Sequence, residues 1–136
     1  MAVKFPTDEW IKAFRDELNS SEAYAKSAKD WEGDFIFVIE GDKTYPETSY
    51  FFVGLLHGKC TDAAMVSSAD ERPAQYILSG PYSTWRKVME GTQDPIQAMM
   101  TRKLKLKGNL MKVMRYPKAA KDMVDSVQRV ESEFPA

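Results

Sequence analysis

Cysteine and histidine are almost absent from this chain of 136 residues, which has one cysteine, Cys60, and one histidine, His57. A single cysteine excludes a disulfide within the chain and a cysteine-rich metal site. His57, Cys60 and Asp62 would supply three mixed metal ligands, but no second cluster and no recognised ligand spacing supports a site there. We therefore expect no bound metal and no cofactor.

Catalytic motifs are equally scarce. The sequence has no glycine-rich phosphate loop and no dinucleotide-binding fingerprint. Catalysis by Cys60 with His57 as the base would need the two side chains within hydrogen-bonding reach and a third group to orient the histidine. Adjacent carboxylates such as Asp16 and Glu17 diverge on a helix and do not form an acid–base pair. These observations favour a protein that is not an enzyme.

Long apolar runs and an export signal are missing as well. No stretch approaches the roughly 20 apolar residues that span a bilayer. The first ten residues, MAVKFPTDEW, lack the apolar core of a secretory signal, and residues 133–136 are not a peroxisomal address of the Ser-Lys-Leu type. Hydrophobic residues make up 43% and charged residues 29%, as in globular proteins. We expect one cytoplasmic domain over residues 1–136.

Acidic residues are absent from one segment of an otherwise acidic chain. Between Thr101 and Lys121 there are eight basic residues and no acidic one, whereas the rest of the chain carries 11 basic and 20 acidic residues. Such a segment can approach an anionic membrane or the anionic head of a ligand, although a solvated strand and helix face would explain it too. Nucleic acid is not expected as a partner, because leucine and methionine, not aromatic residues, separate the basic ones.

Apolar periodicity predicts the elements of the fold. Helical spacing with N-cap residues and glycine stops indicates six helices, at residues 8–18, 22–31, 82–90, 95–100, 110–115 and 118–134. Alternating, β-branched and aromatic runs indicate five strands, at 35–40, 48–58, 60–68, 74–80 and 103–107. Two helices precede any strand, and the spacing of the first four strands suits an antiparallel meander. We predict an α+β domain with a five-stranded, mostly antiparallel sheet covered by helices on one face.

The segment from Asp94 to Arg115 changes its period twice. The Asp94-Pro95 pair begins a helix, because an N-cap residue precedes a proline at the first helical position. From Lys103 to Lys107 the lysines alternate with leucines, as in a strand with one exposed face. The Gly108-Asn109 pair ends the strand and caps a second amphipathic helix. A strand therefore leads directly into a helix.

This segment resembles the signature of the sterol carrier protein type 2 (SCP2) domain, a lipid-binding α/β family. The resemblance is carried by Gly91, Asp94-Pro95, Met99-Met100 and Lys103 to Leu110, with Trp31 to Phe35, Gly54 to Gly58, Leu78-Ser79-Gly80 and Trp85 upstream. Thr101 stands where a glycine is common and Asn109 where an aspartate is common. The resemblance covers most of the chain, and it implies an SCP2-like fold that carries sterol, fatty acid or fatty acyl-CoA.

Methionine fits that role. Six of the eight methionines lie in the last 48 residues, and their unbranched thioether side chains can fill an empty cavity or yield to acyl chains of different shape. Such stripes are also typical of an ordinary core. Burial of about ten methylenes, at about 0.8 kcal/mol each, would drive binding without hydrogen bonds. With the resemblance, we expect these residues to line a hydrophobic tunnel: Trp85, Val88, Met89, Met99, Met100, Leu104, Leu106, Leu110, Met111, Val113, Met114, Met123 and Val127.

Four basic residues are expected at the mouth of this tunnel, where they would pair with a ligand head group or a transient anionic membrane surface. They are Lys105, Lys107, Lys112 and Arg115. An alternative function is an accessory or dimerisation subunit. In that case the Met-rich helix face docks a protein partner, such as a second copy in a homodimer, and no small molecule enters.

Overall fold

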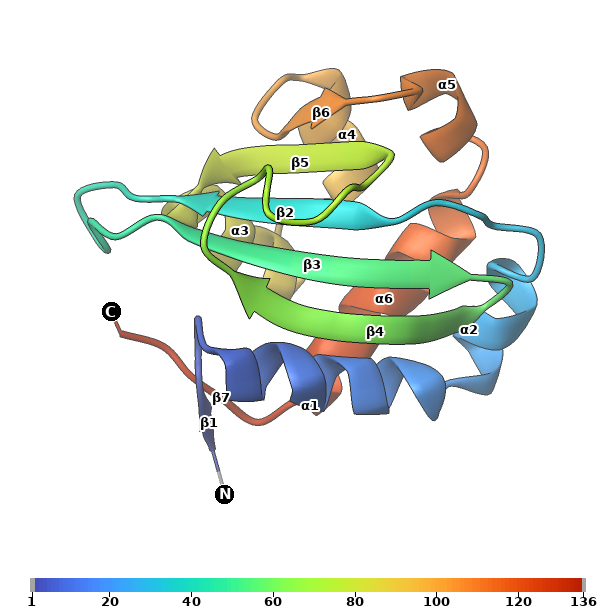
Figure 1. Cartoon of the computed structure of the whole chain (residues 1–136), viewed down its shortest axis with the longest axis horizontal. Helices are drawn as coiled ribbons and strands as arrows, with labels where there is room; N and C mark the ends of the chain where they lie inside the picture. The colour runs from blue at the N-terminus through green and yellow to red at the C-terminus, as the bar shows by residue number, and fades with distance from the viewer. Residues whose placement is uncertain (1, 136) are drawn as a thin grey trace.

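The computed structural model describes residues 2–135. Its helices are α1 (Asp8–Asn19), α2 (Glu22–Ser27), α3 (Tyr82–Glu90), α4 (Pro95–Met100), α5 (Leu110–Val113) and α6 (Pro117–Arg129). Its strands are β1 (Val3–Lys4), β2 (Phe35–Glu40), β3 (Ser49–Leu56), β4 (Lys59–Val66), β5 (Tyr76–Pro81), β6 (Lys105–Lys107) and β7 (Ser132–Glu133). Five of these strands form one sheet in the order β4-β3-β2-β5-β6 (Figure 1).

The main sheet is mostly antiparallel, which confirms the predicted fold class. Strands β2 and β3, β3 and β4, and β5 and β6 pair antiparallel, whereas β2 and β5 pair in parallel. The predicted meander is therefore wrong at one step, because β5 lies beside β2 and not beside β4. Residues 67–75 make the crossing over the open face of the sheet (Figure 1). Alternation within a strand does not specify its neighbour, so the sequence pattern is the same for either pairing.

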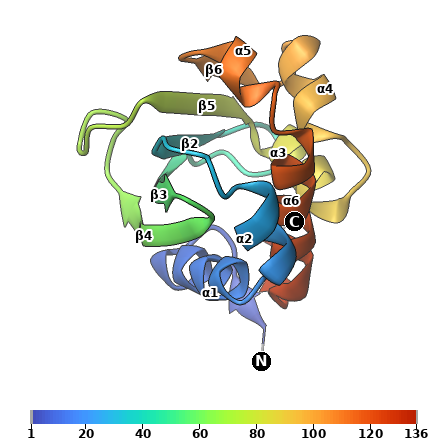
Figure 2. The same ribbon diagram turned by 90° about the vertical axis from the view of Figure 1, so that its right-hand side faces the viewer.

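The helices gather on one face of the sheet, as predicted (Figure 2). The other face carries a small second core of Ile36, Val38, Phe52 and Val66, on which Ala69 and Ala74 of the crossing segment pack. The Arg72 guanidinium lies 3.8 Å above the centre of the Phe52 ring. Because β2 is buried on both faces, its run FIFVIE is continuously apolar instead of alternating.

The local signals that begin and end the predicted helices are confirmed in four places. Thr7 Oγ1 accepts a hydrogen bond from the Trp10 amide at 3.1 Å and caps α1. Asp94 and Asn109 cap α4 and α5 in the same way, with distances of 2.8 and 3.1 Å to the amide nitrogens. Gly91 ends α3 with φ at 83°, in the left-handed region that favours glycine. Each signal acts over no more than one turn of chain.

The two ends of the chain differ from the prediction. Strand β1 precedes the first helix and pairs in parallel with β7. Helix α6 ends at Arg129 instead of continuing to Phe134, because residues 132–133 take the extended backbone of β7. The Phe134 ring then packs 5.7 Å from the Phe5 ring, centre to centre. Pairing between residues some 130 positions apart has no local sequence signal.

Several predicted elements are shorter in the structure. Helix α2 ends at Ser27 and not at Trp31, and α5 ends at Val113. Strand β6 begins at Lys105, because the Leu104 amide donates to the Ala98 carbonyl (3.0 Å) and does not join the strand ladder. Within residues 2–135, no helix combines the length and the apolar character needed to cross a bilayer.

Candidate functional site

Helix α6 is held by the other helices, with α1, α2, α3 and α4 as its close packing partners. On one side of α6 the Asp122 carboxylate is buried and accepts hydrogen bonds from Ser27 of α2 at 2.7 Å and from Lys118 at 2.8 Å. Arg129 pairs with Glu17 of α1 at 3.3 Å. Burial raises the pKa of Asp122, but the hydrogen bonds from Lys118 and Ser27 outweigh it and hold the pKa below its ordinary value. This polar side fixes α6 to the helical layer.

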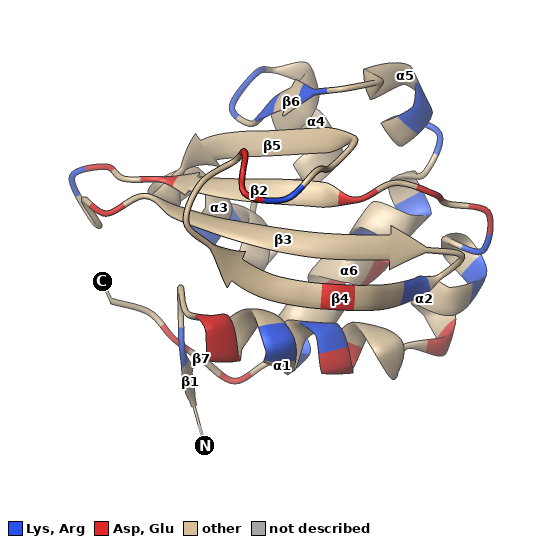
Figure 3. Ribbon diagram, in the orientation of Figure 1, with Lys and Arg blue, Asp and Glu red and all other residues tan. Residues whose placement is uncertain are grey.

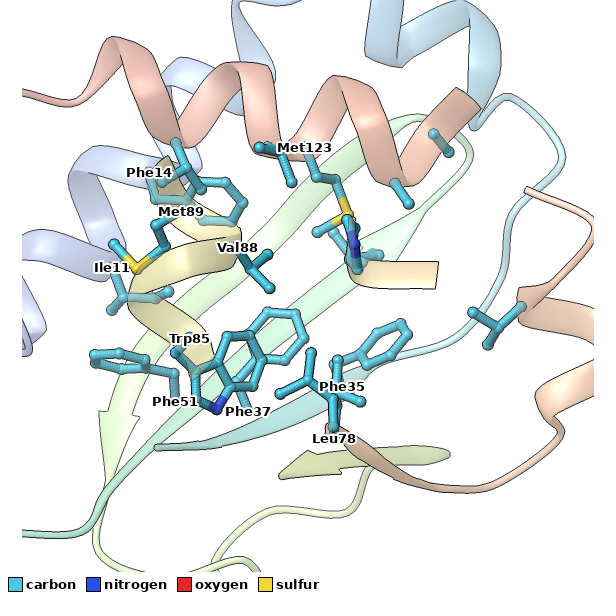
Figure 4. Close-up of a pocket in the computed structure, with 18 of the residues that line it drawn as sticks. Ile11, Phe14, Phe35, Phe37, Phe51, Leu78, Trp85, Val88, Met89 and Met123 are labelled. Carbon is cyan, nitrogen blue, oxygen red and sulfur yellow. The ribbon is translucent and has the colours of Figure 1, made fainter. Parts of the chain in front are cut away.

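The opposite side of α6 faces a cavity of about 140 Å³, whose far wall is the inner face of the sheet. Alternate residues of β2, Phe35, Phe37 and Ile39, point into it, while Ile36 and Val38 belong to the outer face. Figure 4 shows side chains from α1, the sheet, α3 and α6 turned toward this common space. The cavity therefore lies between the sheet and the helix that closes over it.

The lining of the cavity is almost entirely apolar. Each tryptophan in the lining donates its indole N–H to an oxygen of a residue outside the lining: Trp10 to Ser132 Oγ at 2.8 Å, Trp31 to the Gly33 carbonyl and Trp85 to the Val38 carbonyl, both at 2.9 Å. Burial raises the pKa of Tyr24, so its hydroxyl stays neutral. Among residues 2–135, no charged side chain lines the cavity.

Eight of the thirteen residues predicted to line a tunnel do line this cavity. They are Trp85, Val88, Met89, Met99, Leu104, Val113, Met123 and Val127. Leu106 and Leu110 instead line a second pocket on the outside of β6 and α5. Met100 and Met111 are exposed, by 61% and 71%. Met114 is half-buried and lines neither pocket. That the eight lining residues bind a ligand stays a prediction.

The sequence pattern missed the contribution of the first half of the chain. Phe5, Trp10 and Phe14 near the N-terminus, and Phe35 and Phe51 of the sheet, all line the cavity. The i, i+2 spacing of Phe35, Phe37 and Ile39 was the available signal, since it places three large side chains on one face of a strand. This alternation could not be recognised in the sequence because the intervening Ile36 and Val38 are apolar too.

The four basic residues proposed for a mouth lie on β6, on α5 and just after α5. Lys112 Nζ donates to the Glu32 carbonyl at 2.7 Å and lies 4.9 Å from the centre of the Trp31 ring, which is part of the cavity wall. Lys105, Lys107 and Arg115 are exposed. Their side chains form no hydrogen bond or ion pair with any other residue in the part of the chain described. The mouth role remains a prediction.

The stretch with unpaired positive charge is shorter than the 101–121 segment identified from the sequence. Lys118 and Lys121, at its end, pair with Asp122 and Asp125 one helical turn later on α6. The excess of positive charge therefore lies on residues 102–115, around β6 and α5, where Figure 3 shows Lys and Arg without Asp or Glu.

His57 and Cys60 do not form a catalytic arrangement. His57 lies in the two-residue turn between β3 and β4, and its Nε2 is 2.7 Å from a Glu32 carboxylate oxygen at the surface. Cys60 is buried, and burial raises the pKa of its thiol to about 11, so the thiolate is scarce at neutral pH. Among residues 2–135, no group of three potential ligands from His, Cys, Asp and Glu could hold a metal ion.

Comparisons with known proteins agree with this architecture. The family model described as the SCP-2 sterol transfer family matches residues 11–121. The chain is 32% identical to a crystal structure of sterol carrier protein 2, with a TM-score of 0.82 over 91% of this chain and 97% of that chain. It is also 32% identical to a conserved hypothetical protein from Thermus thermophilus, with a TM-score of 0.84 over 96% of this chain and 91% of that chain.

A more distant structure, the apo form of sterol carrier protein 2 from Yarrowia lipolytica, shares the fold, with 22% identity and a TM-score of 0.57 over 90% of each chain. No curated protein sequence matches the chain. The family match spans most of the sequence, contains the five strands of the main sheet and helices α2 to α5, and ends within α6. The chain belongs to the SCP-2 sterol transfer family.

Proposed function

We propose that this protein binds and carries lipid-like molecules, such as a sterol, a fatty acid or a fatty acyl-CoA, without changing them chemically. The observation that supports this most directly is the apolar cavity between α6 and the sheet. Membership of a family described by sterol transfer supports it as well. No charged side chain of residues 2–135 lines the cavity, which favours a ligand whose buried part is hydrocarbon.

The size of the cavity bears on how a ligand would fit. Its volume of about 140 Å³ is close to the ~150 Å³ of an engineered apolar cavity that binds benzene, and below the roughly 300–1,000 Å³ of typical ligand pockets. A long chain would therefore have to displace side chains. Met89, Met99 and Met123 line the cavity from three different helices. Their unbranched side chains can change rotamer at little cost and would open this space.

Binding energy would come from burying methylenes, at about 0.8 kcal/mol each. Because the lining is almost entirely apolar, chains of different length would bind with similar geometry. The head group would remain at the surface, where Lys105, Lys107, Lys112 and Arg115 are proposed to pair with a carboxylate or a phosphate, or with an anionic membrane during loading and release.

A second candidate function is favoured by a different observation. Met111 and Met100 are exposed by 71% and 61%, and Leu110 beside Met111 by 38%. Large exposed apolar side chains in one region are typical of a surface that docks a partner. On this interpretation the protein is an accessory or dimerisation subunit, and the α4–α5 region binds another protein.

Native mass spectrometry of the purified protein, followed by solvent extraction, distinguishes the two functions. A carrier is expected to release a lipid on extraction and to show a matching mass increment in its monomer. An empty homodimer, with no extractable lipid, would contradict the carrier function and favour the docking function.

A further inference from the structure

A second pocket, on the surface, shares a wall with the cavity. It lies between α4, β6 and α5, and its lining residues are Met99, Arg102, Leu104, Lys105, Leu106 and Leu110. Met99 and Leu104 also line the inner cavity. These two side chains therefore form the partition between the cavity and the outer pocket. The outer pocket is lined otherwise by the apolar side chains of Leu106 and Leu110 and by the cationic side chains of Arg102 and Lys105.

The two side chains of the partition differ in freedom. Leu104 is fully buried and its amide is bonded to the Ala98 carbonyl. It also packs on Gly80 so closely that a Cβ at position 80 would lie 2.5 Å from Leu104 Cδ2. Met99 has no branch point and is held only by packing at the end of a six-residue helix. Met99 is therefore the side chain that can swing aside while Leu104 stays in place.

The cations of the outer pocket have no partners of their own. Within residues 2–135, the side chains of Arg102 and Lys105 form no hydrogen bond or ion pair. The backbone of Arg102 is left-handed, with φ at 62°, where a glycine would be the least strained residue. This left-handed residue follows the C-cap of α4, as is common where a helix ends. No acidic residue lies on the surrounding β6–α5 segment (Figure 3).

We propose that the outer pocket is the entrance to the cavity and the head-group site of the ligand. The ligand is a single-chain lipid with an anionic head. Its tail passes Met99 into the cavity, its first methylenes rest on Leu106 and Leu110, and its carboxylate or phosphate is held by Arg102 and Lys105. This inference rests on the proposed carrier function and adds to it the route of entry, the gate and the role of Arg102.

The head-group site is tested by titrating delipidated protein calorimetrically with dodecanoate, dodecyl phosphate and uncharged dodecanol. In the double variant Arg102→Gln/Lys105→Gln, we expect both anions to bind about fivefold more weakly, as for two exposed charge contacts, and dodecanol to bind unchanged. A larger effect on one anion identifies whether a carboxylate or a phosphate is preferred.

The matched control is Lys43→Gln/Lys59→Gln, which removes the same charge from exposed residues outside both pockets. It is expected to leave all three affinities unchanged. Two results would overturn the head-group site. One is an anion affinity that is the same in Arg102→Gln/Lys105→Gln as in the wild type, and the other is an equal loss of anion affinity in both double variants. If the wild type binds none of the three compounds, the carrier function itself fails, which is a separate result.

The gate is tested by the rate of association. Isoleucine is branched at Cβ and therefore stiff at χ1, so Met99→Ile is expected to slow dodecanoate association severalfold, measured by stopped-flow tryptophan fluorescence. Met65→Ile is the control, because Met65 lines neither pocket, and it is expected to associate at the wild-type rate. Equal association rates for the two variants would show that the tail enters elsewhere.

Discussion

Filling the cavity should stabilise the protein and abolish ligand binding at the same time. Ala120 lines the cavity from α6 and is half-buried. The cavity has a volume of about 140 Å³, close to the ~150 Å³ that accommodates benzene, so the ring of Ala120→Phe should fit within it. Burying a phenylalanine side chain contributes about 1.5–3 kcal/mol. The lower helix propensity of phenylalanine costs about 0.5 kcal/mol.

The expected net result is a rise of about 1–2.5 kcal/mol in the free energy of unfolding. It is measured by urea denaturation of delipidated protein, with dodecanoate binding measured on the same samples. Most substitutions in a packed interior destabilise, so a gain is diagnostic of pre-existing space. In the wild type this space is proposed to take the tail of a ligand.

The control is Ala98→Phe. Ala98 is also a helical alanine, but it is fully buried and lines neither pocket, so the same ring has no space and should destabilise by about 1–3 kcal/mol. If Ala120→Phe destabilises as much as Ala98→Phe and still binds dodecanoate, then the cavity is not the ligand site and the reasoning is refuted.

Two further predictions concern charge. The folded-state pKa of Asp122 lies below its ordinary value, so the stability it contributes is present above about pH 4 and is lost as the pH falls below it. Asp122→Asn should therefore unfold about 2 kcal/mol more easily at pH 7, with the difference shrinking in acid denaturation below about pH 4, and a pH-independent difference would contradict this. Glutamine at the four basic positions proposed for the mouth should weaken co-sedimentation with anionic vesicles, most strongly at low salt, whereas unchanged sedimentation would reject the membrane role. Those positions are Lys105, Lys107, Lys112 and Arg115.

Helix α6 shows which part of the cavity lining could be predicted from the sequence. The stripe of Met123 and Val127 was expected on the apolar side of the last helix, and both residues line the cavity. Asp122 and Ser126 lie outside that stripe, yet they are the more deeply buried residues of α6. The apolar stripe is only half-buried because it faces space, while the polar pair is packed against the other helices. Periodicity identifies an apolar side but not what lies opposite it.

The exposed methionines show the complementary error. Met100 and Met99 are adjacent in sequence and were expected to share a role, yet Met99 is buried in the partition and Met100 is exposed. Successive residues on a helix point about 100° apart, so one of two neighbours faces the sheet and the other faces solvent. Which of the two is buried depends on the rotation of α4, and Pro95 with its cap at Asp94 does not specify that rotation.

The sequence by itself determined the composition of the sheet, the fold class and the beginnings of the helices, because caps, glycine stops and alternation act between residues a few positions apart. Asp94, Asn109 and Gly91 are found where those rules place them. Only the tertiary structure decided that β5 lies beside β2, that α6 is anchored to α2 through Ser27 and Asp122, and that space remains beneath it. A cavity is the volume that distant elements leave unfilled, so it depends on their separation and orientation, which no local pattern encodes.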